Sequence, residues 1–134
     1  MLEVYTLNAS VGADSAIPLN NVSIKKGCSA VNSGPSSIEL NKCGVYMVAL
    51  NGVASAATTV QMYKNDIPQP QAQAAGTSLN FETLVQVSEN NSNCCCSSPT
   101  VLRFVNSTSV TFPIVNVDVT KVCWGKEYDN RRNL

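Results

Sequence analysis

The six cysteines are the side chains of this sequence that could do the most chemistry. Three stand in a row at Cys94-Cys95-Cys96, and the others are Cys28, Cys43 and Cys123. Zinc sites usually space paired thiolate ligands by two to four residues, whereas neighbours in an extended chain point to opposite sides, so the triple cysteine fits zinc poorly. Three disulfides could form, but a chain folded in a reducing cytoplasm would keep its thiols. We expect Cys28 and Cys43 to fill apolar positions beside strands.

The remaining residues offer little catalytic chemistry. The chain has no histidine, the commonest general base and metal ligand, so a cysteine nucleophile would have no imidazole beside it. The nine Asp and Glu residues are scattered, with no spacing that forces two carboxylates together as glycosidase chemistry requires. We therefore predict a protein that is not an enzyme, with no catalytic residue, no cofactor and no metal site.

Length and composition predict one domain over residues 1–134. Charged residues make up 13% of the chain, with nine acids balancing nine bases, which argues against nucleic-acid binding. The first residues, Met1 to Leu7, are too short and too acidic for a signal peptide, and no run approaches the ~20 apolar residues of a membrane helix. We expect a soluble protein that is made in a cytoplasm and has no membrane partner.

The sequence predicts short strands. Helical periodicity is missing, and about ten apolar or alternating segments are separated by Gly, Asn, Asp, Ser and Pro, which favours an all-β sandwich or jelly roll. The predicted strands are 3–7, 16–19, 22–25, 37–40, 44–51, 58–64, 72–75, 80–87, 101–106 and 109–120. Pro113 removes a ladder donor inside the last of them, so we expect a bulge or break there.

One predicted strand, 44–51, is apolar on both faces. Alternate side chains of a strand point to opposite sides, so one face carries Val45, Met47 and Ala49 and the other carries Tyr46, Val48 and Leu50. A strand at the surface of a monomeric sandwich normally alternates apolar and polar residues. The second face must be covered by loops of the same chain or by another subunit, and we favour a subunit.

A set of motifs along the chain resembles the C1q-like and tumour-necrosis-factor-like jelly roll. The pattern begins with Ile38-x-Leu40 and Gly44-x-Tyr46-x-Val48, continues through Tyr63-x-Asn65-Asp66-Ile67-Pro68, and closes with Leu102-Arg103-Phe104-Val105-Asn106 and Val115-x-Val117-x-Val119. It looks most like the bacterial and bacteriophage branch that includes the C-terminal domain of the exosporium protein BclA. The resemblance covers residues 16–122 and implies a ten-stranded jelly roll that assembles as a homotrimer.

The resemblance guides the prediction of function. We expect Tyr46, Val48 and Leu50 at the trimer interface. We predict a bacteriophage virion protein, a trimeric capsid decoration or head-fibre protein made in the host cytoplasm, with the major capsid protein or other virion proteins as partners. The alternative is a module on a bacterial cell or spore surface, or a phage receptor-binding protein, that binds carbohydrate or a host-surface receptor.

Two segments would lie outside the matched jelly roll. These are short extensions at residues 1–10 and 123–134, and the second contains Trp124 and Tyr128 as a possible capsid anchor. The triple cysteine, between polar flanks, should form a loop. In a trimer it could bring three copies together at one end of the axis and oxidise between subunits, or it could remain a loop tip with free thiols.

Overall fold

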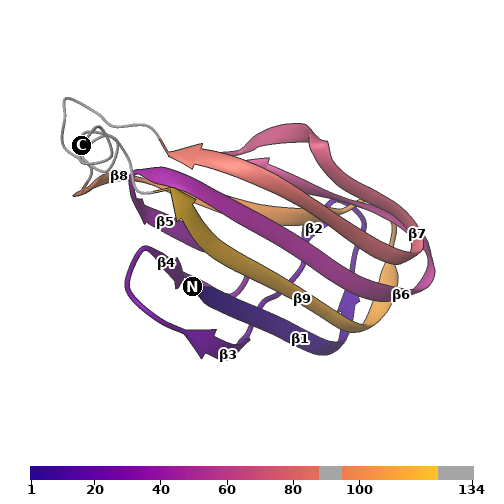
Figure 1. Cartoon of the computed structure of the whole chain (residues 1–134). Coiled ribbons are helices and arrows are strands. Elements are labelled where there is room, and N and C mark those ends of the chain that lie inside the picture. Colours follow the sequence, from indigo (N-terminus) through magenta and orange to yellow (C-terminus); the bar gives the residue numbers. More distant parts are fainter. Residues whose placement is uncertain (88–94, 124–134) are drawn as a thin grey trace.

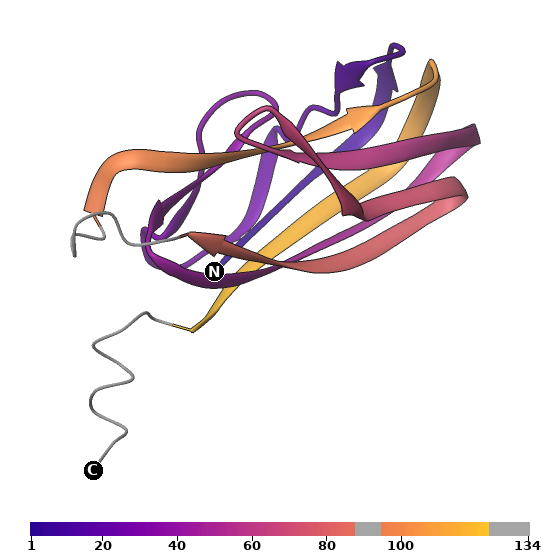
Figure 2. The same ribbon diagram turned by 90° about the horizontal axis from the view of Figure 1, so that it is seen from above.

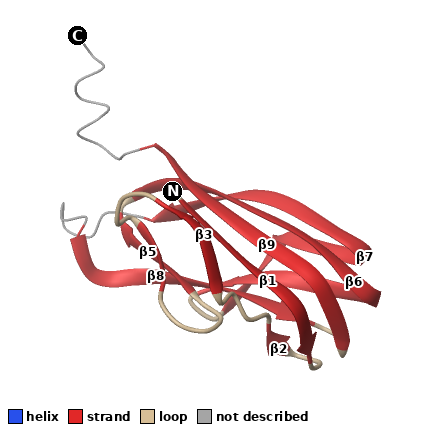
Figure 3. Cartoon of the chain, turned by 90° about the horizontal axis from the view of Figure 1, so that it is seen from below, coloured by secondary structure: helices blue, strands red, loops and turns tan. Residues whose placement is uncertain are grey.

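The protein is an all-β sandwich, seen here in a computed structural model that describes residues 1–87 and 95–123. Figure 3 shows strands and connecting loops, without a helix, in these ranges. The strands are β1 (Leu2–Val11), β2 (Ser15–Ala16), β3 (Asn21–Lys25), β4 (Ala30–Asn32), β5 (Ile38–Lys42), β6 (Gly44–Lys64), β7 (Ile67–Val87), β8 (Cys95–Asn106) and β9 (Val110–Cys123). No helix of the described residues is therefore long and apolar enough to cross a membrane.

The strands form two layers (Figure 1). One layer runs β3-β1-β9-β6-β7, and the other contains β6 and β7 again with β8, β5 and β4, all paired antiparallel. Viewed from above, β8 in orange lies in one layer and β9 in yellow in the other (Figure 2). The long strands β6 and β7 belong to both layers: residues 45–53 of β6 pair with β9, and residues 60–64 pair with β8. The register between β6 and β7 shifts between these two parts, from Val53 to Thr58.

A tight hairpin joins β6 to β7. Lys64 pairs with Ile67 across the two-residue turn Asn65-Asp66, and both turn residues have positive φ, 51° and 68°. This is the backbone of a type I′ turn, in which Asn and Asp are among the preferred residues. The side chain of Asn65 also accepts a hydrogen bond from the backbone N–H of Val101 at 2.8 Å, and Asp66 pairs with Arg103, so the hairpin is tied to β8.

The core lies between the two layers. Its largest fully buried side chains include Tyr46, Phe104, Phe112, Ile38 and Leu102. Side chains alternate along β6, and Tyr46, Val48 and Leu50 point into this core, as expected for one face of a strand that is apolar on both sides.

The structure differs from the predicted strands in several places. The segments 44–51 and 58–64 join into β6, and 72–75 and 80–87 join into β7, so fewer and longer strands form. The short strand β4 was not predicted. The segment 1–10, predicted as an extension with a strand at 3–7, belongs to the sheet, because Leu2–Val11 form β1 between β3 and β9.

A further difference is at Pro113, where β9 continues without a break. The register between β1 and β9 is the same on both sides of it, with Leu7 opposite Ile114 and Ala9 opposite Phe112. The pairing of β9 with β6 ends at Ile114. Pro113 is therefore not paired with β6, and its missing N–H costs no hydrogen bond to that strand. On the β1 side it stands opposite Asn8, whose φ is 53°, and the missing N–H is accommodated by that local distortion.

Candidate interaction face

The outward surface of the β3-β1-β9-β6-β7 layer, which we call the outer face, carries exposed apolar side chains on each of its strands. Five large ones are 38 to 61% exposed: Leu7, Met47, Val53, Leu84 and Ile114. Register brings three of them into one row, because Leu7 pairs with Ile114 and Ile114 with Val53. Met47 and Leu84 are direct neighbours across β6 and β7. Exposed apolar groups of this kind are typical of interaction sites.

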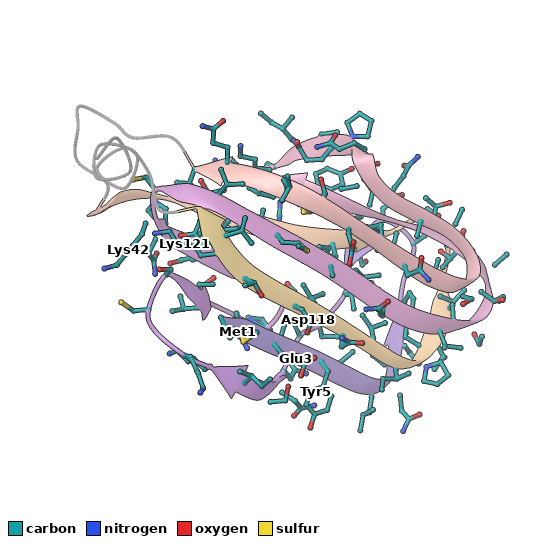
Figure 4. All side chains as sticks on the ribbon, in the orientation of Figure 1. Met1, Glu3, Tyr5, Lys42, Asp118 and Lys121 are labelled. Carbon is teal, nitrogen blue, oxygen red and sulfur yellow. The ribbon has the colours of Figure 1, made fainter. Side chains whose placement is uncertain are left out.

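Polar rows cross the outer face between these apolar positions. In one row, Asn116 of β9 pairs with Asn51 of β6, which pairs with Asn80 of β7. In the next, Glu3 of β1 lies opposite Asp118 of β9, and Ala49 of β6 separates Asp118 from Glu82 of β7. Figure 4 shows Glu3 and Asp118 side by side on their adjoining strands. The face therefore combines apolar contact area with polar groups that could set the register of a partner.

The carboxyl groups of Glu3 and Asp118 form one hydrogen-bonded unit. Desolvation, followed by the hydrogen bond to Glu3 and the charge of Glu3, raises the pKa of Asp118 to about 6, while a hydrogen bond with Asn116 opposes the rise. The pKa of Glu3 is lowered by its hydrogen bond with Asp118 and by that with Ser23, whose Oγ donates to Oε1 of Glu3 at 2.6 Å. Below about pH 6, therefore, the pair holds one proton, which resides on Asp118, while Glu3 carries the charge.

The structure places the predicted interface residues differently from the sequence analysis. The side chains of Tyr46, Val48 and Leu50 are at most 1% exposed, so they pack within their own subunit and are out of reach of a neighbour. The hydroxyl of Tyr46 donates to the carbonyl oxygen of Lys42 at 2.6 Å. The opposite side of β6, with Val45, Met47 and Ala49, faces outward. The possible anchor residues Trp124 and Tyr128 lie outside the described residues.

The cysteines also differ from expectation. Cys28 is a free, exposed thiol rather than an apolar filler. Cys43 is buried, as expected, but it is disulfide-bonded, which corrects the prediction that it keeps its thiol. β8 begins at Cys95, which pairs with Lys42 of β5. Cys95 and Cys96 therefore lie in a strand and not in the predicted loop, and Cys94 lies outside the described residues.

Other parts of the described surface provide weaker candidates for a binding site than the outer face. Within residues 1–87 and 95–123, no group of three His, Cys, Asp or Glu side chains could hold a metal ion. A hollow of about 430 Å³ near the turn that precedes β9 is lined by small hydroxyl side chains, including Ser10, Ser55 and Thr111. These hydroxyls already contact their neighbours, since Ser55 Oγ accepts from the N–H of Thr111 at 3.0 Å and Ser10 lies 3.2 Å from the Thr111 hydroxyl.

Sequence reasoning missed the paired carboxyls. The sequence did contain a signal, because an acidic residue stands between two apolar residues in both Leu2-Glu3-Val4 and Val117-Asp118-Val119. Such a pattern indicates an outward charged residue on each strand, but only the strand register shows that these two face each other.

Comparison with known proteins identifies the fold. No protein-family profile matches the sequence, and no curated protein matches it. Solved structures do match. The globular domain of zebrafish complement 1qA is 5% identical over 87% of this chain and 94% of its own, with a TM-score of 0.59. Rabbit GITRL is 8% identical over 95% and 98%, with a TM-score of 0.61, and murine APRIL is 7% identical over 90% and 98%, with a TM-score of 0.57. The chain therefore has the C1q/TNF-like jelly-roll fold that its sequence motifs predicted.

Proposed function

We propose that this chain is a homotrimeric, non-catalytic binding or structural module whose subunits contact one another through the outer face. The observation that carries the proposal is the presence of two groups of exposed apolar side chains on the outer face, one on β1, β9 and β6 and the other on β6 and β7. Burying such a face releases ordered water and stabilises association by about 25 cal/mol for each Å² of apolar surface. The C1q-like and TNF-like resemblance of the sequence implies the trimer.

The proposal that the protein is not an enzyme rests on composition. Acid–base and nucleophilic catalysis depend mostly on histidine or on converging carboxylates, and the chain has no histidine. The carboxyls that do converge, Glu3 and Asp118, lie on an open face with apolar neighbours.

Two roles follow for such a trimer. One is ligand binding on a cell, spore or phage surface, with carbohydrate or a receptor as the ligand. The other is decoration of a bacteriophage capsid, which rests on the sequence motifs alone. The genes beside this one separate the roles, because a neighbouring major capsid protein gene supports decoration and a spore-surface locus supports the binding module.

Light scattering after size-exclusion chromatography tests the trimer. The wild-type protein should have three times the 14.3 kDa mass of one subunit. Leu84→Asp should give a folded monomer, because Leu84 is 61% exposed in the subunit and tolerates charge there, whereas an unpaired charge in an interface costs several kcal/mol.

Ile67→Asp is the matched control. Ile67 is 62% exposed but begins β7 at the hairpin, away from the outer face, so this variant should remain trimeric. A wild-type monomer at micromolar concentration, or a monomeric Ile67→Asp beside a trimeric Leu84→Asp, would contradict the assignment of this face.

A further inference from the structure

A hollow of about 270 Å³ lies on the outer face around the paired carboxyls. Glu3 and Asp118 form its acidic side, and Met1, Ile24 and Met47 contribute apolar walls. Oδ1 of Asp118 is already buried within one subunit and has no hydrogen-bond partner there. A subunit packed on the outer face would remove further water from this carboxyl.

Two carboxylates directly opposite each other on neighbouring strands repel if both are charged. Covering them with a second subunit strengthens that repulsion, because charges interact more strongly away from water. A single proton held between the groups removes the repulsion and turns the contact into a charge-assisted hydrogen bond. The geometry of Glu3 and Asp118, with Ser23 Oγ donating to Glu3, suits this arrangement.

We propose that the Glu3–Asp118 pair of each subunit holds one shared proton in the trimer, so that assembly takes up protons and weakens as the pH rises. The inference rests on the proposed assembly through the outer face. It adds a regulation to that face, since a change of pH alone would shift the population between trimers and free subunits.

The direction of the effect follows from linkage. In the free subunit the pKa of Asp118 is about 6, and further desolvation in the trimer raises it. Below about pH 6 both states hold the proton and assembly does not depend on this pair. Above it the free subunit loses a proton that the trimer retains, so the association constant falls with rising pH. Each proton taken up contributes about tenfold per pH unit, and three subunits about a thousandfold at the limit.

Most side chains that line the hollow beside the pair are uncharged. β3 contributes Ile24 and β6 contributes Met47 and Ala49, none of them titratable, and β7 contributes the acid Glu82. Met1 also lines the hollow, and its amino group donates to the carbonyl oxygen of Lys26 at 2.8 Å.

Sedimentation equilibrium of the intact chain from about pH 5 to about pH 8 tests the inference. The wild-type association constant should be level at the acid end and fall at least about tenfold per pH unit above about pH 6. Asp118→Asn keeps a neutral hydrogen-bonding group at the position and should remove this pH dependence. Glu39→Gln, which removes a carboxyl on β5 in the other layer, should retain it.

The outcomes separate this inference from the proposed trimer. A protein that is monomeric at every pH would overturn the trimer and with it the proton linkage. A trimer whose association constant does not change with pH, or changes equally in Asp118→Asn, would overturn only the linkage. Circular dichroism at each pH establishes that the variants remain folded.

Discussion

The side chain of Asn106 connects several segments at one end of the sandwich by hydrogen bonds. It is fully buried, accepts a hydrogen bond from the hydroxyl of Thr58 and donates to the carbonyl oxygens of Val11 and Thr108. Asn106→Leu would leave these groups buried and unpaired, so we expect the free energy of unfolding to fall by at least about 2 kcal/mol. Urea denaturation measures it. Ser107→Ala, which removes an exposed acceptor of the Thr59 N–H, should cost less than about 1 kcal/mol, and equal losses would refute this role.

The structural role of a residue can be predicted from the sequence when it depends on neighbouring residues, but not when it depends on residues far away in the chain. The Asn65-Asp66 turn was predictable because both residues tolerate positive φ and the signal lies within a few positions of sequence. The pairing of Glu3 with Asp118 was not, because the two residues are at opposite ends of the chain and meet only through the register of β1 on β9. The shift in the pKa of Asp118 depends on that register and on burial.

The close pairing of β6 with β9 depends on Gly52, which lies opposite Val115. A Cβ atom at Gly52 would lie 2.8 Å from Cγ2 of Val115 and 3.3 Å from the carbonyl oxygen of Ile114, closer than unstrained packing allows. Gly52→Ala should therefore push the two strands apart and lower the free energy of unfolding by about 1–3 kcal/mol. Chemical denaturation gives the value. Gly12→Ala is the control, because its Cβ would have nothing nearer than Ser15 Oγ at 3.6 Å, and a loss as large as that of Gly52→Ala would contradict the steric argument.

At the scale of elements, alternation predicted where strands exist but not where they end. The segments 44–51 and 58–64 were separated by small residues, Ala54, Ser55, Ala56 and Ala57, which carry little periodic signal. In the structure β6 passes through this region from one layer to the other. Small side chains allow β6 to pass from one layer to the other. Because they show no apolar alternation, the sequence did not predict that the strand continues through them.

At the scale of the molecule, the sequence predicted the fold class, but not which face of β6 packs in the core. Both sides of 45–50 are apolar, and alternation alone cannot rank them. Burial does: Tyr46, Val48 and Leu50 meet the other layer, and Met47 is left 38% exposed. The choice depends on which side of the first layer the second one packs, and this is a long-range property of the topology.

If the outer face is buried between subunits, unfolding is coupled to dissociation. Anything that binds the folded state and not the unfolded one raises stability with its concentration, and here each subunit is the ligand of the others. We therefore expect the wild-type melting temperature to rise with protein concentration, as measured by calorimetry over a wide concentration range. Leu84→Asp should melt at a lower temperature that does not depend on concentration, while Ile67→Asp should behave as the wild type. A trimer by light scattering whose melting temperature is independent of concentration would mean that the subunit's own two-layer core, and not the outer face, sets its thermal stability.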